Sequence, residues 1–290
     1  MVRTYVFSFL KTRKACCTPT ARRGLCLCGL LLLSIHLSAQ EPADLDFEQV
    51  YTLSGTYPLM ATDRLQQLYL ADSTYHIRKF DKQGRLLFDY SNRALGAPSR
   101  IDPFDPFEVV VFYPDFGTIL VLDRTLNELY RVNLQDFGYF GIEAVARASD
   151  KNIWLFQPLA FQLEKINSQG EPLLQSRVLN EVLPAAPSRI VEKDQFVYLQ
   201  VPEHGLFVFD TFGQFVLQIR EPGSNEFQVS GQQIFYLKEH QLFSFQLNLL
   251  EERSIPLPAD LQAPIGAFSL QGQRLYLATP KQLFVFKENH

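Results

Sequence analysis

The sequence is poor in the residues that build disulfides, metal centres and nucleophilic sites. It contains four cysteines, five histidines and two methionines in 290 residues. All four cysteines lie between residues 16 and 28, close to or inside an apolar N-terminal stretch. If that stretch is removed, the remaining chain has no cysteine. This excludes a disulfide, a thiolate metal site and a cysteine nucleophile.

The sequence also lacks the short motifs of common catalytic sites. It has no G-x-S-x-G elbow and no glycine-rich phosphate loop. Asp102 and Asp105 have a spacing similar to that of glycosidase carboxylates, but Asp-Pro is ordinary turn chemistry, so we interpret their stretch as a turn. His76, His204 and His240 fall in three separate expected turns. A metal centre needs ligands that converge, so these histidines are expected to be surface residues.

Residues 1–39 have the pattern of a secretory signal peptide. Six basic residues and no acidic residue occur in residues 1–24, and an apolar run follows at Leu25–Leu37. That run has 13 residues, fewer than the roughly 20 that a membrane-spanning helix needs. Cys26 and Cys28 precede the apolar core, so lipid attachment is not expected. We predict cleavage after about residue 39 and a soluble protein in the periplasm or outside the cell.

Removal of this segment makes the protein strongly acidic. The whole chain has 27 basic and 31 acidic residues and a net charge of −4. Without the six basic residues of the leader, 21 basic residues face 31 acidic ones, which gives −10. Such a charge disfavours binding to nucleic acid and to anionic membrane surfaces. We therefore expect no nucleic-acid partner and no stable membrane insertion after signal cleavage.

Beyond residue 40 the chain is rich in aromatic residues and shows no sustained helical period. The 25 phenylalanines and 12 tyrosines favour strands. Short alternating apolar runs recur between Gly, Pro, Asn and Asp. Leu68–Tyr90 is the clearest case, and there Gly84 supplies the positive φ of a tight turn. The pattern predicts an all-β fold.

One unit of this pattern recurs six times. An apolar residue followed by a polar one returns at steps of 42, 44, 43, 36 and 41 residues, at Phe80-Asp81, Leu122-Asp123, Ile166-Asn167, Phe209-Asp210, Phe245-Gln246 and Phe286-Lys287. Six units of about 40 residues, each with four short strands, are typical of a six-bladed β-propeller. A β-sandwich, the alternative, gives no reason for this near-constant spacing.

The ends of the chain are expected to close the ring. The last unit ends at its third strand, in residues 282–290, and an additional strand is expected at about residues 47–55. Pairing these two strands would complete the sixth blade and remove the open strand edges of a linear array. We therefore predict a single propeller domain over residues 40–290.

The first blade resembles the NHL family of repeats. That family's pattern runs apolar-Tyr-Val-Ala-Asp, then a turn, then Phe-Asp-x-x-Gly, and "LYLAD" and "KFDKQG" within Leu68–Leu87 match it. The turn is one residue shorter here and lacks the usual Asn-His-Arg core. The resemblance implies a propeller that serves mostly as a binding platform, with some lyases and hydrolases among its relatives. This breadth means that the fold alone does not assign a function.

The word "APSRI" occurs twice, at Ala97–Ile101 and Ala186–Ile190. Both copies lie in expected linkers between blades, on the face that surrounds the mouth of the central channel. Arg100 and Arg189 should therefore hold equivalent positions, with Glu143 near the corresponding place in the blade between them. An ion-pair network between inner strands is one interpretation. The other is an anion site, because guanidinium groups grip carboxylates and phosphates.

No metal or cofactor is expected at this channel mouth. Propeller lactonases hold calcium with oxygen ligands at the starts of their inner strands. The residues expected at these six positions, with an uncertainty of one position, are Met60, Arg100, Glu143, Arg189, Phe227 and Gly266. Among them only Glu143 is an oxygen ligand, and Arg100 and Arg189 are cations. Cations would repel a metal ion.

The sequence therefore favours an exported, non-enzymatic binding or scaffold protein. Its ligand would be a protein, a peptide or an anionic group at the channel mouth, contacted by Arg100, Arg189 and Glu143. Exposed aromatic residues of the linkers, such as Phe104, Tyr139 and Phe227, are expected as anchors. A lactonase-like hydrolase or lyase and a purely structural envelope protein are the alternatives.

Overall fold

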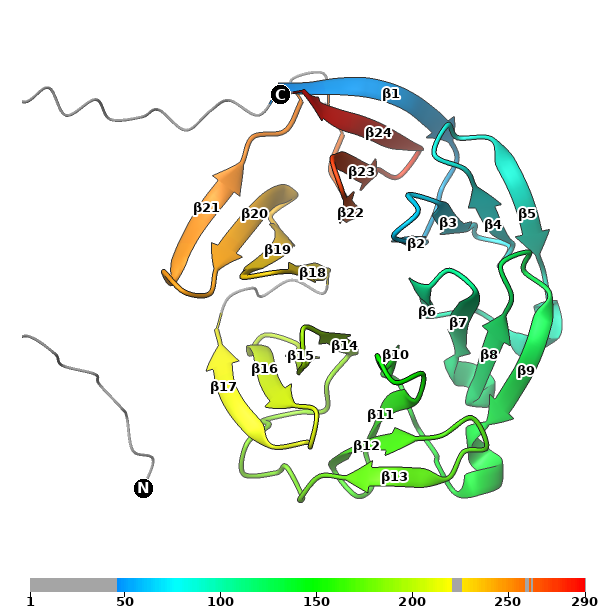
Figure 1. Ribbon diagram of the computed structural model, residues 1–290, viewed down its shortest axis with the longest axis vertical. Helices are drawn as coiled ribbons and strands as arrows, with labels where there is room; N and C mark the ends of the chain where they lie inside the picture. Colours follow the sequence, from blue (N-terminus) through cyan, green and yellow to red (C-terminus); the bar gives the residue numbers. More distant parts are fainter. Residues whose placement is uncertain (1–45, 221–225, 259–260, 262, 290) are drawn as a thin grey trace, which may run out of the picture. The chain divides into compact units, whose positions relative to one another are not determined.

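The described chain forms a ring of six four-stranded antiparallel sheets (Figure 1). The structure is a computed structural model that describes residues 46–220, 226–258, 261 and 263–289. It confirms the six-bladed β-propeller predicted from the repeat. The predicted signal peptide, residues 1–39, lies outside the described residues. None of the helices in the described part of the chain is long and apolar enough to span a membrane.

Each blade contains four strands in order from the channel to the rim. The first three blades are β2 (Leu59–Thr62), β3 (Leu68–Ala71), β4 (Ile77–Phe80) and β5 (Leu86–Tyr90); β6 (Arg100–Asp105), β7 (Glu108–Tyr113), β8 (Thr118–Leu122) and β9 (Glu128–Asn133); and β10 (Val145–Arg147), β11 (Ile153–Gln157), β12 (Gln162–Ile166) and β13 (Pro172–Gln175). Short 3-10 helices follow three strands of the first two blades, at η1 (Arg93–Leu95), η2 (Pro114–Phe116) and η3 (Leu134–Phe137).

Blades four and five continue the same order. They are β14 (Arg189–Lys193), β15 (Phe196–Val201), β16 (Gly205–Asp210) and β17 (Phe215–Ile219), then β18 (Phe227–Ser230), β19 (Gln233–Lys238), β20 (Gln241–Gln246) and β21 (Glu251–Ile255).

Blade six combines the first strand of the described chain with the last three. Its inner strands are β22 (Ala267–Gln271), β23 (Arg274–Ala278) and β24 (Gln282–Asn289), and its outermost strand is β1 (Asp46–Ser54). β1 pairs antiparallel with β24, from Ser54 opposite Gln282 to Asp46 opposite Asn289. This pairing confirms the predicted closure of the ring.

The repeated apolar-Asp-x-x-Gly motif forms the turn between the third and fourth strands of a blade. In blade one the Asp81 carboxylate accepts hydrogen bonds of 2.9 Å from the backbone N–H groups of Gln83 and Arg85. Gly84 has a φ of +81°, which a side chain would disfavour. Asp123, Asn167 and Asp210 accept the corresponding pairs of bonds in blades two, three and four. The motif recurs because each of these turns needs the same local hydrogen bonds.

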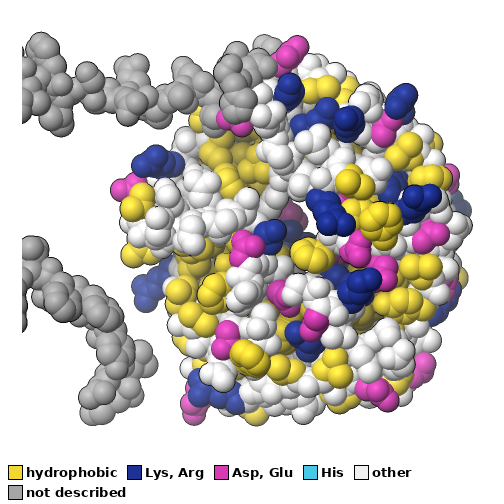
Figure 2. All heavy atoms as spheres, viewed as in Figure 1, with side chains coloured by type: hydrophobic (Ala, Val, Ile, Leu, Met, Phe, Trp, Pro, Cys, Tyr) yellow, Lys and Arg dark blue, Asp and Glu magenta, His cyan; other side chains and the backbone are white. Residues whose placement is uncertain are grey.

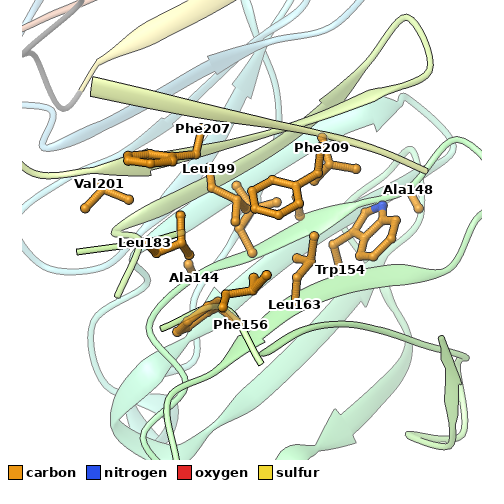
Figure 3. Close-up of a cluster of buried hydrophobic side chains, with 14 residues drawn as sticks. Ala144, Ala148, Trp154, Phe156, Leu163, Leu183, Leu199, Val201, Phe207 and Phe209 are labelled. Carbon is orange, nitrogen blue, oxygen red and sulfur yellow. The ribbon is translucent and has the colours of Figure 1, made fainter. Parts of the chain in front are cut away.

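The hydrophobic core consists of six clusters, one at each interface between neighbouring blades. At the interface of blades three and four, Trp154 and Phe156 of β11 face Phe207 and Phe209 of β16 (Figure 3). Alternate residues of each strand point to opposite faces of the sheet. Each blade therefore packs apolar side chains against both of its neighbours, which explains the short-range apolar pattern of the sequence.

Candidate functional site

The inner strands of the six blades surround a central channel (Figure 1). Two cavities occupy this channel. The one of about 280 Å³, which Ser99, Glu143 and Ser188 of the linkers line, is called the upper cavity. The one of about 200 Å³, which Phe104 and Arg147 line, is called the lower cavity. Arg100, Arg189, Glu226 and Met60 line both cavities, so they lie where the two meet. The channel therefore has a charged zone in its middle.

The two copies of Ala-Pro-Ser-Arg-Ile hold the same structural position. In each, the proline and the isoleucine are buried, and the serine is exposed. The N–H of Ser99 donates to the carbonyl of Phe112 at 2.9 Å, and the N–H of Ser188 donates to that of Gln200 at 2.8 Å. These bonds fix the start of the innermost strand. As predicted, they place Arg100 and Arg189 in equivalent positions facing the channel.

Arg189 is paired with a carboxylate from the next blade. Its Nη1 lies 2.6 Å from Oε2 of Glu226. Its guanidinium carbon also lies 5.1 Å from the centre of the Phe227 ring, a distance at which a cation is attracted to an aromatic face. The charge of Arg189 therefore has a specific partner at the interface of blades four and five.

Arg147, which lines the lower cavity, is also paired. It is almost fully buried, and its Nη2 forms an ion pair with Glu108. Its Nη1 donates to the hydroxyl oxygen of Tyr130 at 3.4 Å. This guanidinium connects blade three to blade two.

Arg100 differs from both of these arginines. Its guanidinium forms no ion pair with any residue in the described part of the chain. Its buried Nε, like that of Arg147, has no hydrogen-bond partner. Burial lowers the pKa of Arg100 to about 10, and the positive charge of Arg189 adds to this effect. Asp102 and Glu226 act in the opposite direction. At neutral pH Arg100 is thus a charged, half-buried cation with no carboxylate of the described residues in contact.

Glu143 lies at the rim of the upper cavity. Its side chain is exposed, and it lines the cavity together with Arg100 and Arg189. The following residue, Ala144, accepts the inner-strand hydrogen bond from the N–H of Phe156. Glu143 is therefore one position outside the equivalent site, and within the described residues it forms no ion pair with either arginine. The structure brings the three predicted residues to one cavity, and their role in binding stays a prediction.

Glu226 is the charged residue that the sequence did not indicate. It precedes β18, and its backbone carbonyl accepts a hydrogen bond of 3.5 Å from the N–H of Leu237. We expected Phe227 at this place, one position later. The signal was present, because an acidic residue directly before an inner strand is the complement of the arginines at the starts of β6 and β14.

Two of the three expected aromatic anchors are buried. Phe104 is 47% exposed and lines the lower cavity. Tyr139 is 7% exposed, and its hydroxyl donates to Glu164 at 3.0 Å. Phe227 is buried beneath Arg189. The expectation that Tyr139 and Phe227 are exposed was wrong, because each side chain points into an interface between blades rather than outward.

The histidines lie away from the channel cavities. His204 Nδ1 contacts the carbonyl of Pro202 at 2.8 Å, and His240 Nδ1 contacts that of Ile265 at 3.0 Å. Within the described residues, no group of three or more histidine, cysteine or acidic side chains is arranged to hold a metal ion. Asp102 and Asp105 accept backbone N–H groups of Phe104 and Phe107. Both lie in the innermost strand β6, where the register is irregular between them, and not in a turn as we had interpreted their stretch; the turn to β7 follows Asp105.

The comparisons with known proteins establish the fold. No family model matches the sequence, and no curated protein matches it. The WD40 domain of Pan2 from Neurospora crassa has a TM-score of 0.62 and 11% identity, over 86% of this chain and 97% of that domain. Virginiamycin B lyase from Staphylococcus aureus has a TM-score of 0.55 and 13% identity, over 79% of this chain and 80% of the lyase.

BamB from Moraxella catarrhalis is a third similar structure, with a TM-score of 0.51 and 11% identity over 84% of this chain and 98% of BamB. At such identities the likeness shows the propeller architecture alone. The similar structures include a lyase as well as a WD40 domain, so they do not select one function. The NHL resemblance stays a prediction of the sequence.

Proposed function

We propose that this protein is an exported, non-enzymatic binding module that recognises a carboxylate of a protein or peptide partner in the channel. Arg100 carries this proposal, because it is the arginine of the channel zone without a carboxylate in contact among the described residues. A desolvated guanidinium is most stable with a carboxylate that accepts two parallel hydrogen bonds. The carboxylate that Arg100 lacks within the chain would come from the ligand.

The shape of the upper cavity suits a small group at the end of a larger ligand. Its volume of about 280 Å³ lies near the lower limit of small-molecule pockets. Ser99, Ser188 and Glu143 are exposed at its rim. A glutamate side chain or the C-terminal residue of a peptide would reach Arg100, while the rest of the partner stays on the linker face.

A lyase or hydrolase is less well supported. Such chemistry needs a group that transfers a proton, most often histidine. No histidine occurs among the described residues that line the two channel cavities. The carboxylate of Glu226 is engaged with Arg189. No specific observation therefore favours an enzyme over a binding module.

The test is calorimetric titration of the purified protein with three hexapeptides that share one parent sequence without acidic residues. One has a free C-terminal carboxylate, one is amidated, and one is amidated but carries a glutamate. We expect saturable binding of at least one carboxylate peptide, no binding of the plain amidated peptide, and a loss of at least tenfold in affinity in Arg100→Gln.

Arg93→Gln is the matched control, because Arg93 lies in the same linker with an exposed side chain. It should bind as the unchanged protein does. Equal affinity in Arg100→Gln, or equal affinity for the plain amidated peptide, would show that the channel does not recognise a carboxylate. Thermal melting of each variant shows whether the ring remains folded.

A further inference from the structure

Five of the six interfaces between blades are completed by an apolar side chain of the linker that leads into the next blade. Around the ring from blade one, these side chains are Leu95; Leu134, Tyr139 and Ile142; Leu179 and Leu183; Leu257, Leu261 and Ile265; and Tyr57. Each packs against the cluster between its two blades. The linker therefore contributes to the core as well as connecting strands.

The sequence of the linker between blades four and five contains no large apolar residue. It runs from residue 220 to residue 226 and reads Arg-Glu-Pro-Gly-Ser-Asn-Glu. Its only apolar residue is one proline. The cluster at this interface contains residues of strands and of the turn after β20, with no linker side chain among the described residues.

An open apolar groove lies at the same interface. It has a volume of about 470 Å³, and its lining is almost entirely apolar, with Tyr198, Val208, Leu217 and Ile219 from blade four and Phe245 and Leu250 from blade five. A cavity of about 150 Å³ is enough to hold benzene, so the groove has room for more than one apolar side chain. It lies at the interface whose linker sequence has no large apolar residue.

The groove exposes more apolar surface than a folded protein usually leaves in one place. Leu217 is 43% exposed and Leu250 is 74% exposed, and Phe196 at the other side of the groove is 38% exposed. Hydrophobic side chains are visible along the boundary of blades four and five in Figure 2. Contiguous patches of this kind mark sites of interaction with other molecules.

Arg220 adds a charge to the groove. Its side chain is exposed and lines the groove directly after Ile219, the last residue of β17. It forms no ion pair with the residues that the structure describes. An acidic residue beside the apolar anchor of a ligand would complement this cation.

We propose that the groove between blades four and five binds a segment of a partner protein that inserts leucine-sized side chains and places an acidic residue against Arg220. The segment would add apolar side chains to this interface, as linker residues of the chain do at the other five. Leu179 and Leu183 show the form of such a segment, because they pack into the neighbouring interface from a stretch that also contains Glu181. This site is separate from the channel and does not depend on Arg100.

The experiment uses the chain's own linker as the probe. A fluorescein-labelled peptide with the sequence of residues 176–188 is titrated with the full-length protein, and fluorescence anisotropy reports binding. We expect saturable binding that weakens at least tenfold in Leu217→Asp and in Leu250→Asp. Arg220→Glu should weaken it about threefold to tenfold, and a peptide with Glu181→Lys should partly restore binding to that variant.

Leu173→Asp is the control variant, because Leu173 is similarly exposed on β13, the outermost strand of blade three, away from the groove. It should bind the peptide as the unchanged protein does. Leu250 lies in a turn and is mostly exposed, so Leu250→Asp should fold even if Leu217→Asp does not. No saturable binding, or binding that Leu250→Asp leaves unchanged, would overturn the proposal.

Sedimentation velocity completes the test. A protein that stays monomeric leaves the groove free for the partner segment that we propose. A dimer that Leu250→Asp dissociates would show that a second copy of the chain covers the groove, and would overturn the proposed occupant.

Discussion

Arg189 and Glu226 form an ion pair of 2.6 Å that joins the inner strands of blades four and five. It lies beside Arg100, whose pKa is lowered first by burial and then by the charge of Arg189. Glu226 therefore pairs with the charge of Arg189 and weakens the electrostatic repulsion between Arg189 and Arg100. The same two blades form the groove on their outer side, so this pair secures the channel side of the interface whose linker sequence has no large apolar residue.

Replacing Glu226 by glutamine should destabilise the ring modestly. Glu226 is 42% exposed, so the expected loss is about 1 kcal/mol rather than the larger value of a fully buried pair. This corresponds to a Tm about 2–4 °C lower in a domain of this size. Thermal melting at low and high salt is the measurement, and salt should reduce the difference.

The matched control for this change is Glu251→Gln. Glu251 and Arg253 form a pair of 3.0 Å in which both side chains are exposed, and such pairs contribute little. A Tm of Glu226→Gln equal to that of the unchanged protein would contradict a structural role of the pair in the channel.

Alkaline pH should destabilise the protein through its buried tyrosines. Burial raises the pKa of Tyr198 to about 12, and the charge of Asp194 contributes. Burial also raises the pKa of Tyr69 and of Tyr113. In the unfolded chain a tyrosine ionises near pH 10. Stability should therefore be unaffected by these groups below about pH 10 and should fall between about pH 10 and 12.

The expected slope is about 1.4 kcal/mol per pH unit for each tyrosine that ionises only in the unfolded chain. Urea unfolding at several alkaline pH values measures it. Tyr198→Phe should make the decrease less steep, whereas Tyr75→Phe, at an exposed position, should leave it as it is. An unchanged slope in Tyr198→Phe would show that this side chain is not protected in the folded state.

The Asp123 turn should be sensitive to removal of its carboxylate. Asp123 accepts hydrogen bonds from the N–H groups of Thr125 and Asn127 at 2.7 and 2.9 Å. Asp123→Ala should cost about 1–2 kcal/mol, as at a capping position. Asp123→Asn should cost less, because Asn167 makes the same two bonds in blade three. Urea unfolding at neutral pH distinguishes the two variants.

Acid titration tests the same turn independently. Burial opposes the ionisation of Asp123, but hydrogen bonds from Thr125 and Asn127 outweigh it and lower its pKa. A lowered pKa gives stability that is present above the pKa of the unfolded chain, near 4, and is lost as the pH falls through the folded pKa. Stability of Asp123→Asn should therefore decline less below about pH 4 than that of the unchanged protein. Parallel curves would contradict this.

Gly205 should tolerate no side chain. It has a φ of +87°, and a Cβ there would overlap the backbone carbonyl oxygen of Ile219. Gly205→Ala should cost roughly 2–5 kcal/mol, because strain and overlap with the main chain add together. Gly138 has a φ of +80°, and no atom lies within 4 Å of the place that a Cβ would take there. Gly138→Ala should therefore cost only the strain, about 1–2 kcal/mol. Urea unfolding compares the two variants, and equal losses would show that the overlap is relieved.

The propeller could be predicted because its turns repeat a local rule. Asp81 and Gly84 lie at fixed positions of one turn, and the spacing to Asp123 then gives the size of a blade. Arg100 and Arg189 were placed correctly for the same reason, since Ala-Pro-Ser fixes where each inner strand begins. Local hydrogen bonds can be inferred from short words of sequence.

The remainder of the site depends on which face of a strand each residue occupies. Glu226 was missed because no such word precedes β18, and a shift of one position reverses the face on which a side chain lies. Tyr139 was expected to be exposed because it lies in a linker, but this linker packs its apolar side chains between blades two and three. The groove could not be predicted, because its opening depends on how side chains of two different blades pack against each other and not on a local word of sequence.

The pairing of β1 with β24 has a consequence for how the protein unfolds. In an open array of repeats, the terminal units have one neighbour and can unfold before the rest. Here every blade has two neighbours, so loss of any blade exposes two apolar faces at once. Thermal and chemical denaturation should therefore give a single cooperative transition, and amide protons in the inner strands of all six blades should exchange at similar slow rates.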